Sequence, residues 1–179
     1  MRREGRGEVN YEQWVKTVPE EIIGDSLWKV EAYRLALFVT ELGWYDIAKL
    51  MRDKRMHGLA DQLNRALGSI SANIAEGYSR GTGKGRALFY EYALGSARES
   101  RDWYYKSRHV IEEEVITHRL RLLTQIIRLL LTMVPQQRGR SLREDIAKYN
   151  HNSCDPEASW NIDPDELVDL LQNVPSLVK

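Results

Sequence analysis

The sequence predicts an all-α protein: an antiparallel up-down-up-down four-helix bundle with short helical N- and C-terminal extensions. Strand patterns are nearly absent, whereas apolar residues recur with the 3.6-residue period of a helix from Ser26 to Val134. Short polar or glycine-bearing stretches divide this region into four long segments. Long helices joined by short loops pack antiparallel to their neighbours. We therefore expect an N-terminal extension over residues 1–25, the bundle over 26–135, and a C-terminal linker and short-helix tail over 136–179.

The first helix of the bundle is expected to start at Asp25 or Ser26, both favourable N-cap residues, and to end near Met51. Its apolar residues form two stripes. The first stripe comprises Val30, Tyr33, Leu37, Trp44, Ile47 and Met51. The second comprises Trp28, Ala32, Leu35, Val39 and Leu42. Because one stripe suffices to face a core, this helix has apolar surface to spare.

The second and third helices are expected at about residues 56–78 and 87–111, with the glycine-bearing stretch 79–86 as the loop between them. The second helix has a single apolar stripe, which comprises Leu59, Leu63, Ala66, Ile70 and Ile74. The residues that the third helix is expected to bury are Phe89, Tyr92, Ala93, Ser96, Ser100, Trp103, Ser107 and Val110.

The fourth helix follows three glutamates at 112–114 and is expected to end at Val134, where Pro135 would stop it. Its inner seam comprises Leu120, Leu123, Ile127, Leu130 and Val134, and a second apolar face comprises Leu122, Ile126, Leu129 and Met133. The positions that stay polar are Arg121, Gln125, Arg128 and Thr132. A wide core-facing arc would explain this doubling. We favour a subunit interface, because a monomer rarely leaves a large apolar patch in water.

The C-terminal tail carries a short amphipathic helix. Asp163 is its expected N-cap and Pro164 its first residue, with acidic residues in the first turn. Such a segment either folds back onto its own bundle or docks on another molecule. The candidate partner-binding residues of the tail are Trp160, Leu167, Leu170, Leu171 and Val174.

Charge does not direct the whole chain toward nucleic acid or membrane, because 26 basic residues balance 26 acidic ones. The layout is uneven, however. Residues 26–135 contain 17 Lys/Arg and 12 Asp/Glu, which gives 17 − 12 = +5. Residues 1–25 give 4 − 6 = −2, and residues 136–179 give 5 − 8 = −3. A mildly basic bundle thus carries two mildly acidic ends.

The sequence offers no catalytic residue, metal site or cofactor site, so we expect a protein that is not an enzyme. Cys154 is the only cysteine, which excludes an internal disulfide and a cysteine-based zinc site. None of the four histidines lies three residues after a glutamate, as the di-iron motif of helical bundles requires. The stretch 77–85 lacks the glycine and hydroxyl positions of a phosphate-binding loop. With neither a signal peptide nor an apolar membrane span, the expected location is the cytoplasm.

The second and third helices contain matching small residues. Folding one against the other about a turn near Thr82 sets Arg65 opposite Glu99, and Gly68 and Ser69 opposite Gly95 and Ser96. We expect close packing of the two backbones there, with the ion pair fixing their register. Toward the loop, Asn73 and Glu76 are expected to hold Tyr78 and Arg80. The loop cations Arg80, Lys84 and Arg86 either contact phosphate groups or are simply solvated.

These residues carry a resemblance to a known family. The matching residues are Gln62, Arg65, Ala66, Ser69, Ile70, Asn73, Ile74, Ala75, Glu76, Gly77, Arg80, Gly95, Ser96 and Glu99. Together they resemble the four-helix-bundle proteins encoded in intervening sequences of 23S ribosomal RNA genes. A sister branch comprises the accessory variability proteins of diversity-generating retroelements. The resemblance covers about residues 26–135, and it implies a ring-like pentamer; in the sister branch, the ring binds a reverse transcriptase and nucleic acid.

Three hypotheses about function follow. The first is a homo-oligomeric scaffold that binds nucleic acid, or a nucleic-acid enzyme such as a reverse transcriptase. Its candidate nucleic-acid-binding residues are Arg80, Lys84, Arg86, Arg98, Arg101, Lys106 and Arg108. The second is a protein-interaction module that acts through the C-terminal tail and has no nucleic-acid role. The third is an enzyme of unrecognised type, which a bound metal or cofactor would indicate.

Overall fold

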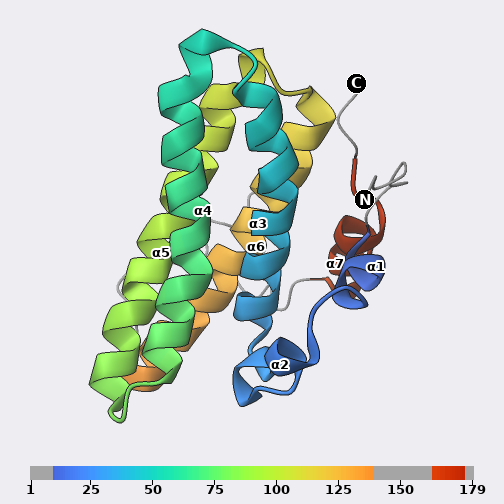
Figure 1. Cartoon of the computed structure of the whole chain (residues 1–179). Coiled ribbons are helices and arrows are strands. Elements are labelled where there is room, and N and C mark those ends of the chain that lie inside the picture. The colour runs from blue at the N-terminus through green and yellow to red at the C-terminus, as the bar shows by residue number, and fades with distance from the viewer. Residues whose placement is uncertain (1–9, 139–162, 176–179) are drawn as a thin grey trace, which may run out of the picture.

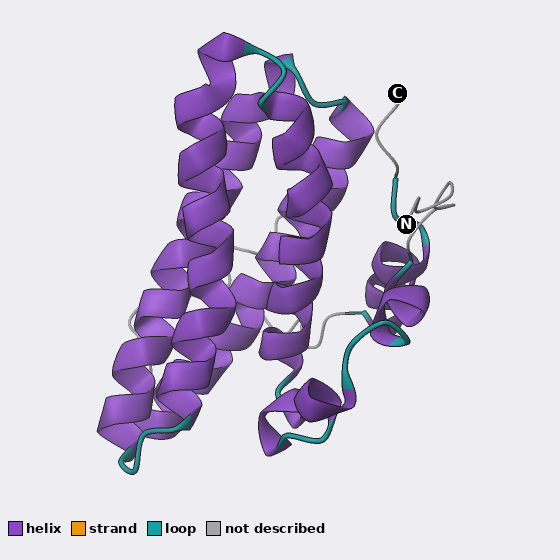
Figure 2. Cartoon of the chain, viewed as in Figure 1, coloured by secondary structure: helices purple, strands orange, loops and turns teal. Residues whose placement is uncertain are grey.

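A computed structural model describes residues 10–138 and 163–175 of the chain. Four long helices form an antiparallel up-down-up-down bundle (Figure 1): α3 (Glu31–Leu50), α4 (His57–Tyr78), α5 (Gly83–Lys106) and α6 (Glu113–Arg138). Within the described ranges all regular structure is helical, and loops connect the helices (Figure 2). The predicted all-α bundle is confirmed.

Shorter helices flank the bundle. In the described parts of the extensions lie the α-helices α1 (Tyr11–Val15), α2 (Glu20–Ile23) and α7 (Pro164–Gln172). Three short 3₁₀ helices lie at the connections: η1 (Ser26–Lys29), η2 (Lys54–Met56) and η3 (Ser107–His109). Helices α1 and α7 are far apart in sequence but lie side by side on one flank of the bundle (Figure 1).

The extensions share the core of the bundle. Trp14 of α1 and Leu170 and Val174 of the tail belong to the same cluster of buried apolar side chains as the long helices. The ring of Phe38 on α3 contacts Tyr11 and Trp14, with centroid distances of 5.2 Å to each. Of the two arrangements open to the tail, the structure therefore shows the one in which α7 folds back onto its own bundle.

The first bundle helix differs from the prediction at its start. The carboxylate of Asp25 accepts a hydrogen bond from the backbone N–H of Leu27 at 2.8 Å, and the residues after it form the 3₁₀ helix η1. Val30 has an extended backbone and separates η1 from α3. Asp25 is thus an N-cap, as expected, but of a short 3₁₀ turn.

The loop between the second and third helices is shorter than predicted. Thr82 caps α5, because its Oγ1 accepts a hydrogen bond from the backbone N–H of Gly85 at 3.1 Å. Helix α5 therefore begins at Gly83. The glycines that suggested a longer loop form the first turn of the helix. A Cβ on Gly83 would lie 2.5 Å from the carbonyl oxygen of Gln137, so a side chain there would collide with the end of α6.

Pro135 does not end the fourth helix, and that prediction is wrong. Helix α6 continues through Pro135 to Arg138. Proline loses the hydrogen bond to the carbonyl four residues earlier and its ring crowds that carbonyl, and here the helix ends within one further turn. The extra turn packs on α5, where the Arg138 guanidinium lies 2.7 Å from the Glu91 carboxylate.

The predicted buried face of the third helix is partly wrong. Ala93, Ser100 and Ser107 are buried as expected, but Tyr92 is 51% exposed and Phe89 is only half-buried. The residues of α5 that face the core are Ala87, Tyr90, Ala93, Leu94, Ala97, Ser100 and Tyr104. Many of them are small, which lets neighbouring helices approach closely.

The second apolar face of the fourth helix lies mostly inside the molecule. Leu122 and Ile126 are fully buried, and so is Gln125, which was expected to stay polar and outside. Helix α6 therefore has a wide buried arc, because it packs on α3, α5 and α7. The surplus apolar surface that remains belongs to α3.

The predicted pairing between the second and third helices is also wrong. Arg65 lies 2.7 Å from Asp61 in its own helix, and Glu99 accepts a hydrogen bond from the Trp103 ring N–H at 3.1 Å. Open space surrounds Gly68 and Gly95. An ion pair in one case and a hydrogen bond in the other, each between residues one helical turn apart, satisfy these side chains within their own helices.

Candidate interaction surfaces and a buried polar network

The outer face of α3 carries a row of apolar residues, of which Trp44 and Met51 are exposed and the others pack partly against the core. This α3 outer stripe comprises Tyr33, Leu37, Trp44, Ile47 and Met51, five of the six residues of the first predicted stripe. Trp44 is 71% exposed and Met51 is 48% exposed, whereas the other three are half-buried. An indole buries on the order of 200 Å² in a core, so leaving most of it in water forgoes about 3 kcal/mol.

The basic residues at the turn between α4 and α5 are held locally. Arg80 forms an ion pair with Glu76, and its guanidinium lies 4.3 Å from the centre of the Phe89 ring. The Arg86 Nε donates a hydrogen bond to the Arg80 carbonyl at 2.9 Å. Lys84 is exposed in the first turn of α5 and has no ion-pair partner among the described residues. Of the predicted ties to the loop, the contact between Glu76 and Arg80 is confirmed, whereas the Asn73 amide donates to the Ser69 carbonyl of its own helix.

The remaining basic candidates lie farther along α5 and in η3, which follows it. Lys106 lies 2.5 Å from the Asp102 carboxylate and 4.3 Å from the centre of the Trp103 ring. Arg108 lies 4.2 Å from the centre of the Tyr105 ring, whereas Arg98 and Arg101 are half-buried near the middle of the helix. The seven candidates thus extend from one end of α5 to the other and do not form one patch.

The residues that carry the family resemblance lie mainly on the outer seam between α4 and α5. Arg65, Glu76, Gly95 and Glu99 are exposed, and Ser69, Asn73 and Ser96 are half-buried. Their polar groups satisfy their own helices: the Asn73 amide donates to the Ser69 carbonyl at 2.8 Å, and the Ser96 hydroxyl donates to the Tyr92 carbonyl at 3.0 Å. The apolar members Ala66, Ile70 and Ile74 are buried. Gly77 is buried as well, and a Cβ there would lie 2.8 Å from the Tyr90 ring.

The apolar residues proposed for the tail face the chain itself. Leu170 and Val174 are each 6% exposed, and Leu167 and Leu171 are half-buried. Trp160 lies outside the described residues. On this helix Val168 is the large apolar residue left exposed, at 48%.

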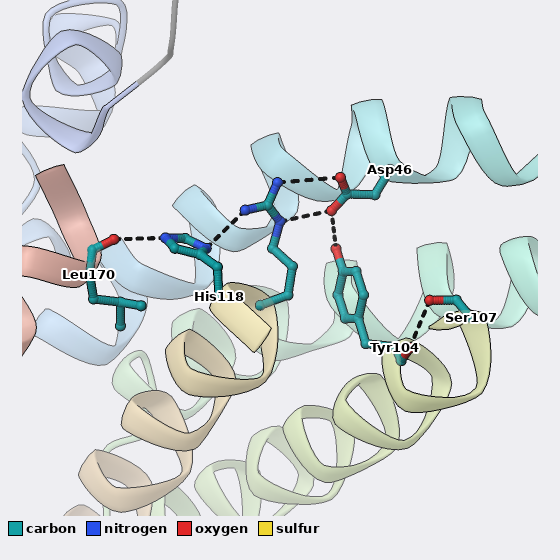
Figure 3. A network of polar contacts seen from close by, with 6 residues as sticks. Asp46, Tyr104, Ser107, His118 and Leu170 are labelled. Atoms are coloured by element: carbon teal, nitrogen blue, oxygen red, sulfur yellow. Dashed lines mark hydrogen bonds and ion pairs between the residues drawn. The ribbon is translucent and has the colours of Figure 1, made fainter. Parts of the chain in front are cut away.

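A buried polar network joins three helices of the bundle (Figure 3). Arg119 of α6 donates from Nε to the Asp46 carboxylate of α3 at 2.8 Å, and from Nη2 to the other oxygen at 3.3 Å. The Tyr104 hydroxyl of α5 donates to the same carboxylate at 2.8 Å. Burial, and next the Asp46 charge, raise the pKa of Tyr104 well above its ordinary value.

The network continues to the C-terminal tail through His118. Arg119 Nη1 donates to His118 Nδ1 at 2.8 Å, so Nε2 carries the ring proton and donates to the Leu170 carbonyl at 2.7 Å. Burial, and next the Arg119 charge, lower the pKa of His118 to about 4. The ring is therefore neutral at physiological pH and ties α7 to the bundle.

Sequence reasoning missed this network, although a signal was present. Asp46 follows Leu35, Val39 and Leu42 at core spacing along the second predicted stripe. A charged residue at a core position requires a buried partner of opposite charge, and Arg119 of the fourth helix supplies it. Nothing in the spacing of the sequence identifies which cation that would be.

A comparison with protein families identifies the family of this bundle. The family model described as 23S rRNA-intervening sequence protein matches residues 29–132, which is more than half of the chain and all but the ends of the bundle. The chain belongs to this family. Among curated proteins none matches this intervening-sequence protein, and no solved structure matches it.

The described part of the chain has neither a candidate membrane span nor a candidate metal cluster. Of the helices in that part, none combines the length and apolar character needed to cross a bilayer. The same part contains no group of three or more His, Cys, Asp or Glu side chains placed to hold a metal ion.

Proposed function

We propose that the chain is a non-enzymatic scaffold that self-associates through the α3 outer stripe and binds nucleic acid, or an enzyme that acts on it. The observation that carries the proposal is Trp44, which is 71% exposed in a row of apolar residues on a long helix. A second copy that covers this row removes the indole from water. The family resemblance favours a closed ring of five copies.

The nucleic-acid part of the proposal is supported by the charge of the bundle. Residues 26–135 carry a net charge of 17 − 12 = +5, and several copies in one ring multiply that charge. Three of the candidate cations lie over aromatic rings: Arg80 over Phe89, Lys106 over Trp103, and Arg108 over Tyr105. A cation held over a ring still presents its outer side to a phosphate group.

The buried network suits a scaffold. Asp46, Arg119 and Tyr104 are buried and hydrogen-bond one another, so their polar groups are committed to holding three helices together. The tail hypothesis has less support, because Leu170 and Val174 are buried in the chain's own core.

The assembly is tested by native mass measurement at micromolar concentration, first on the full chain and then on a Trp44→Lys variant. We expect an oligomer for the unchanged chain and a folded monomer for the variant, because a lysine at the interface centre would be buried without a partner. The matched control is Tyr105→Lys, which changes an aromatic residue of 54% exposure at an end of α5 and leaves the assembly intact. A monomer for the unchanged chain would contradict the proposal.

A further inference from the structure

Helix α7 is attached to the bundle by few contacts. Only Leu170 is buried within this helix, Val174 is buried just after it, and Val168 is 48% exposed. Among the described residues, the buried hydrogen bond between this helix and the bundle comes from the His118 ring. A segment with so little buried apolar surface opens at a lower free-energy cost than the long helices beneath it.

The bond from His118 satisfies a group that the helix cannot satisfy itself. Leu170 lies in the last turn of α7, where backbone carbonyls lack intrahelical partners. The neighbouring carbonyl of Asp169 accepts from the Asn173 N–H at 2.8 Å, whereas the Leu170 carbonyl accepts from His118. If the ring moves away, this carbonyl is left unpaired inside the protein while α7 stays docked.

The contacts of the ring require it to be neutral. A second proton would go to Nδ1, which faces the Arg119 Nη1 donor at 2.8 Å. Arg119 is 3% exposed and is held by Asp46 on α3, so it cannot retreat without leaving that carboxylate unpaired. The charged ring itself would therefore have to move.

Other charged groups near the ring do not offset the repulsion between Arg119 and a protonated His118. On α6, Arg119 and Arg121 oppose a charged ring, and on α7 Asp169 favours it. A cavity of about 710 Å³ lies at this junction; its lining includes His118, Arg121, Asp169 and the glutamates at 112–114. Glu112 is already paired with Lys49. The His118 ring thus borders a space that is large enough to hold water molecules, and it can turn into that space.

We propose that α7 is a detachable strap, held on the bundle by the neutral His118 ring, and that protonation of this ring releases α7 while the four long helices stay folded. Release uncovers the flank of the bundle on which α7 lies. The strap couples the protonation state of one imidazole to the exposure of this flank.

The test places a spin label on α7 of the full chain. Val168→Cys supplies the exposed attachment site, and Cys154→Ser removes the only natural cysteine. The mobility of the label and the far-ultraviolet circular dichroism are followed from pH 7.5 downward. We expect the label to become mobile as the pH falls from the ordinary histidine pKa of 6.5 through the His118 pKa of about 4, because only the released ring binds the proton readily, while nearly all helical signal remains.

Two variants sharpen the test. His118→Gln keeps an amide that donates to the Leu170 carbonyl but cannot titrate, so the label should stay immobile through the same pH range. His109→Gln, which changes an exposed histidine elsewhere, should leave the transition unchanged. The proposal is overturned if α7 stays immobile below pH 4, if the helical signal collapses together with its release, or if His118→Gln releases α7 at the same pH.

Discussion

Arg119 is the residue on which the interior depends most. It is 3% exposed and neutralises Asp46, which is fully buried between α3, α5 and α6. Replacing Arg119 by methionine would retain most of the side-chain volume but leave the Asp46 carboxylate without its cation. We expect Arg119→Met to lower the free energy of unfolding by about 3–5 kcal/mol.

Urea unfolding followed by circular dichroism measures this loss. The matched control is Arg65→Met, which breaks the exposed pair with Asp61 and should cost less than about 1 kcal/mol. Equal losses in the two variants would show that the buried pair contributes no more than a surface pair.

Gly77 and Gly95 provide a second comparison between residues. A Cβ on Gly77 would lie 2.8 Å from the Tyr90 ring and 3.0 Å from Phe89 Cβ, whereas a Cβ on Gly95 meets open space. We expect Gly77→Ala to destabilise the protein by about 1–3 kcal/mol through overpacking. Gly95→Ala should stabilise it by about 0.5–1 kcal/mol, because alanine is the better helix former. Thermal unfolding of both variants gives the two signs, and a stabilising Gly77→Ala would contradict the close approach of α5 to α4 at this glycine.

At the scale of the element, the start of α5 depends on its N-cap residue Thr82. Thr82 caps the helix by accepting from the Gly85 N–H at 3.1 Å, and two glycines follow in the first turn. We expect Thr82→Ala to cost about 1 kcal/mol. Thr132→Ala, which removes a hydroxyl bonded to its own helix at 3.2 Å, should change stability by less than 0.5 kcal/mol, on the order typical of exposed sites. Chemical denaturation distinguishes the two; equal effects would mean that Thr82 does not cap α5.

The elements also show where sequence patterns mislead. The core stripe of α4 was predicted from spacing, because its apolar residues follow one clear period. The face of α5 was not, since large aromatic residues lie on both sides of this helix: Tyr90 and Tyr104 are buried, whereas Tyr92 is exposed. The position of an aromatic residue therefore did not identify the buried side. The end of α6 was misjudged for a different reason: packing against α5 carries the helix past Pro135.

At the scale of the whole molecule, the fold class and the order of the four long helices were predictable, because each depends on periodicity and on short connections. The network of Asp46, Tyr104, His118 and Arg119 was not. It joins residues far apart in sequence, and only the packed bundle shows which polar groups meet. The prediction of surplus apolar surface is half right: α3 keeps exposed apolar residues, whereas the chain itself covers most of those on α6.

The salt dependence of nucleic-acid binding tests the assembled molecule. If the scaffold neutralises phosphate groups, retention of RNA or DNA should weaken steeply as salt increases, because condensed counterions are released. Lys84→Ala removes an exposed cation that lacks an acidic partner among the described residues, so it should lower the slope of log K against log salt. Lys54→Ala, an exposed cation on η2, serves as the control. Filter retention across a salt series measures both; an affinity independent of salt would contradict this role.

The side-by-side placement of α1 and α7 makes the boundaries of any shortened fragment consequential. Phe38 rests against Tyr11 and Trp14, which precede the family-matched stretch 29–132, and α7 follows it. A fragment trimmed to that stretch would bare Phe38 and the flank beneath α7. Self-association of such a fragment would then report the cut itself, so the assembly must be tested on a chain that retains α1 and α7.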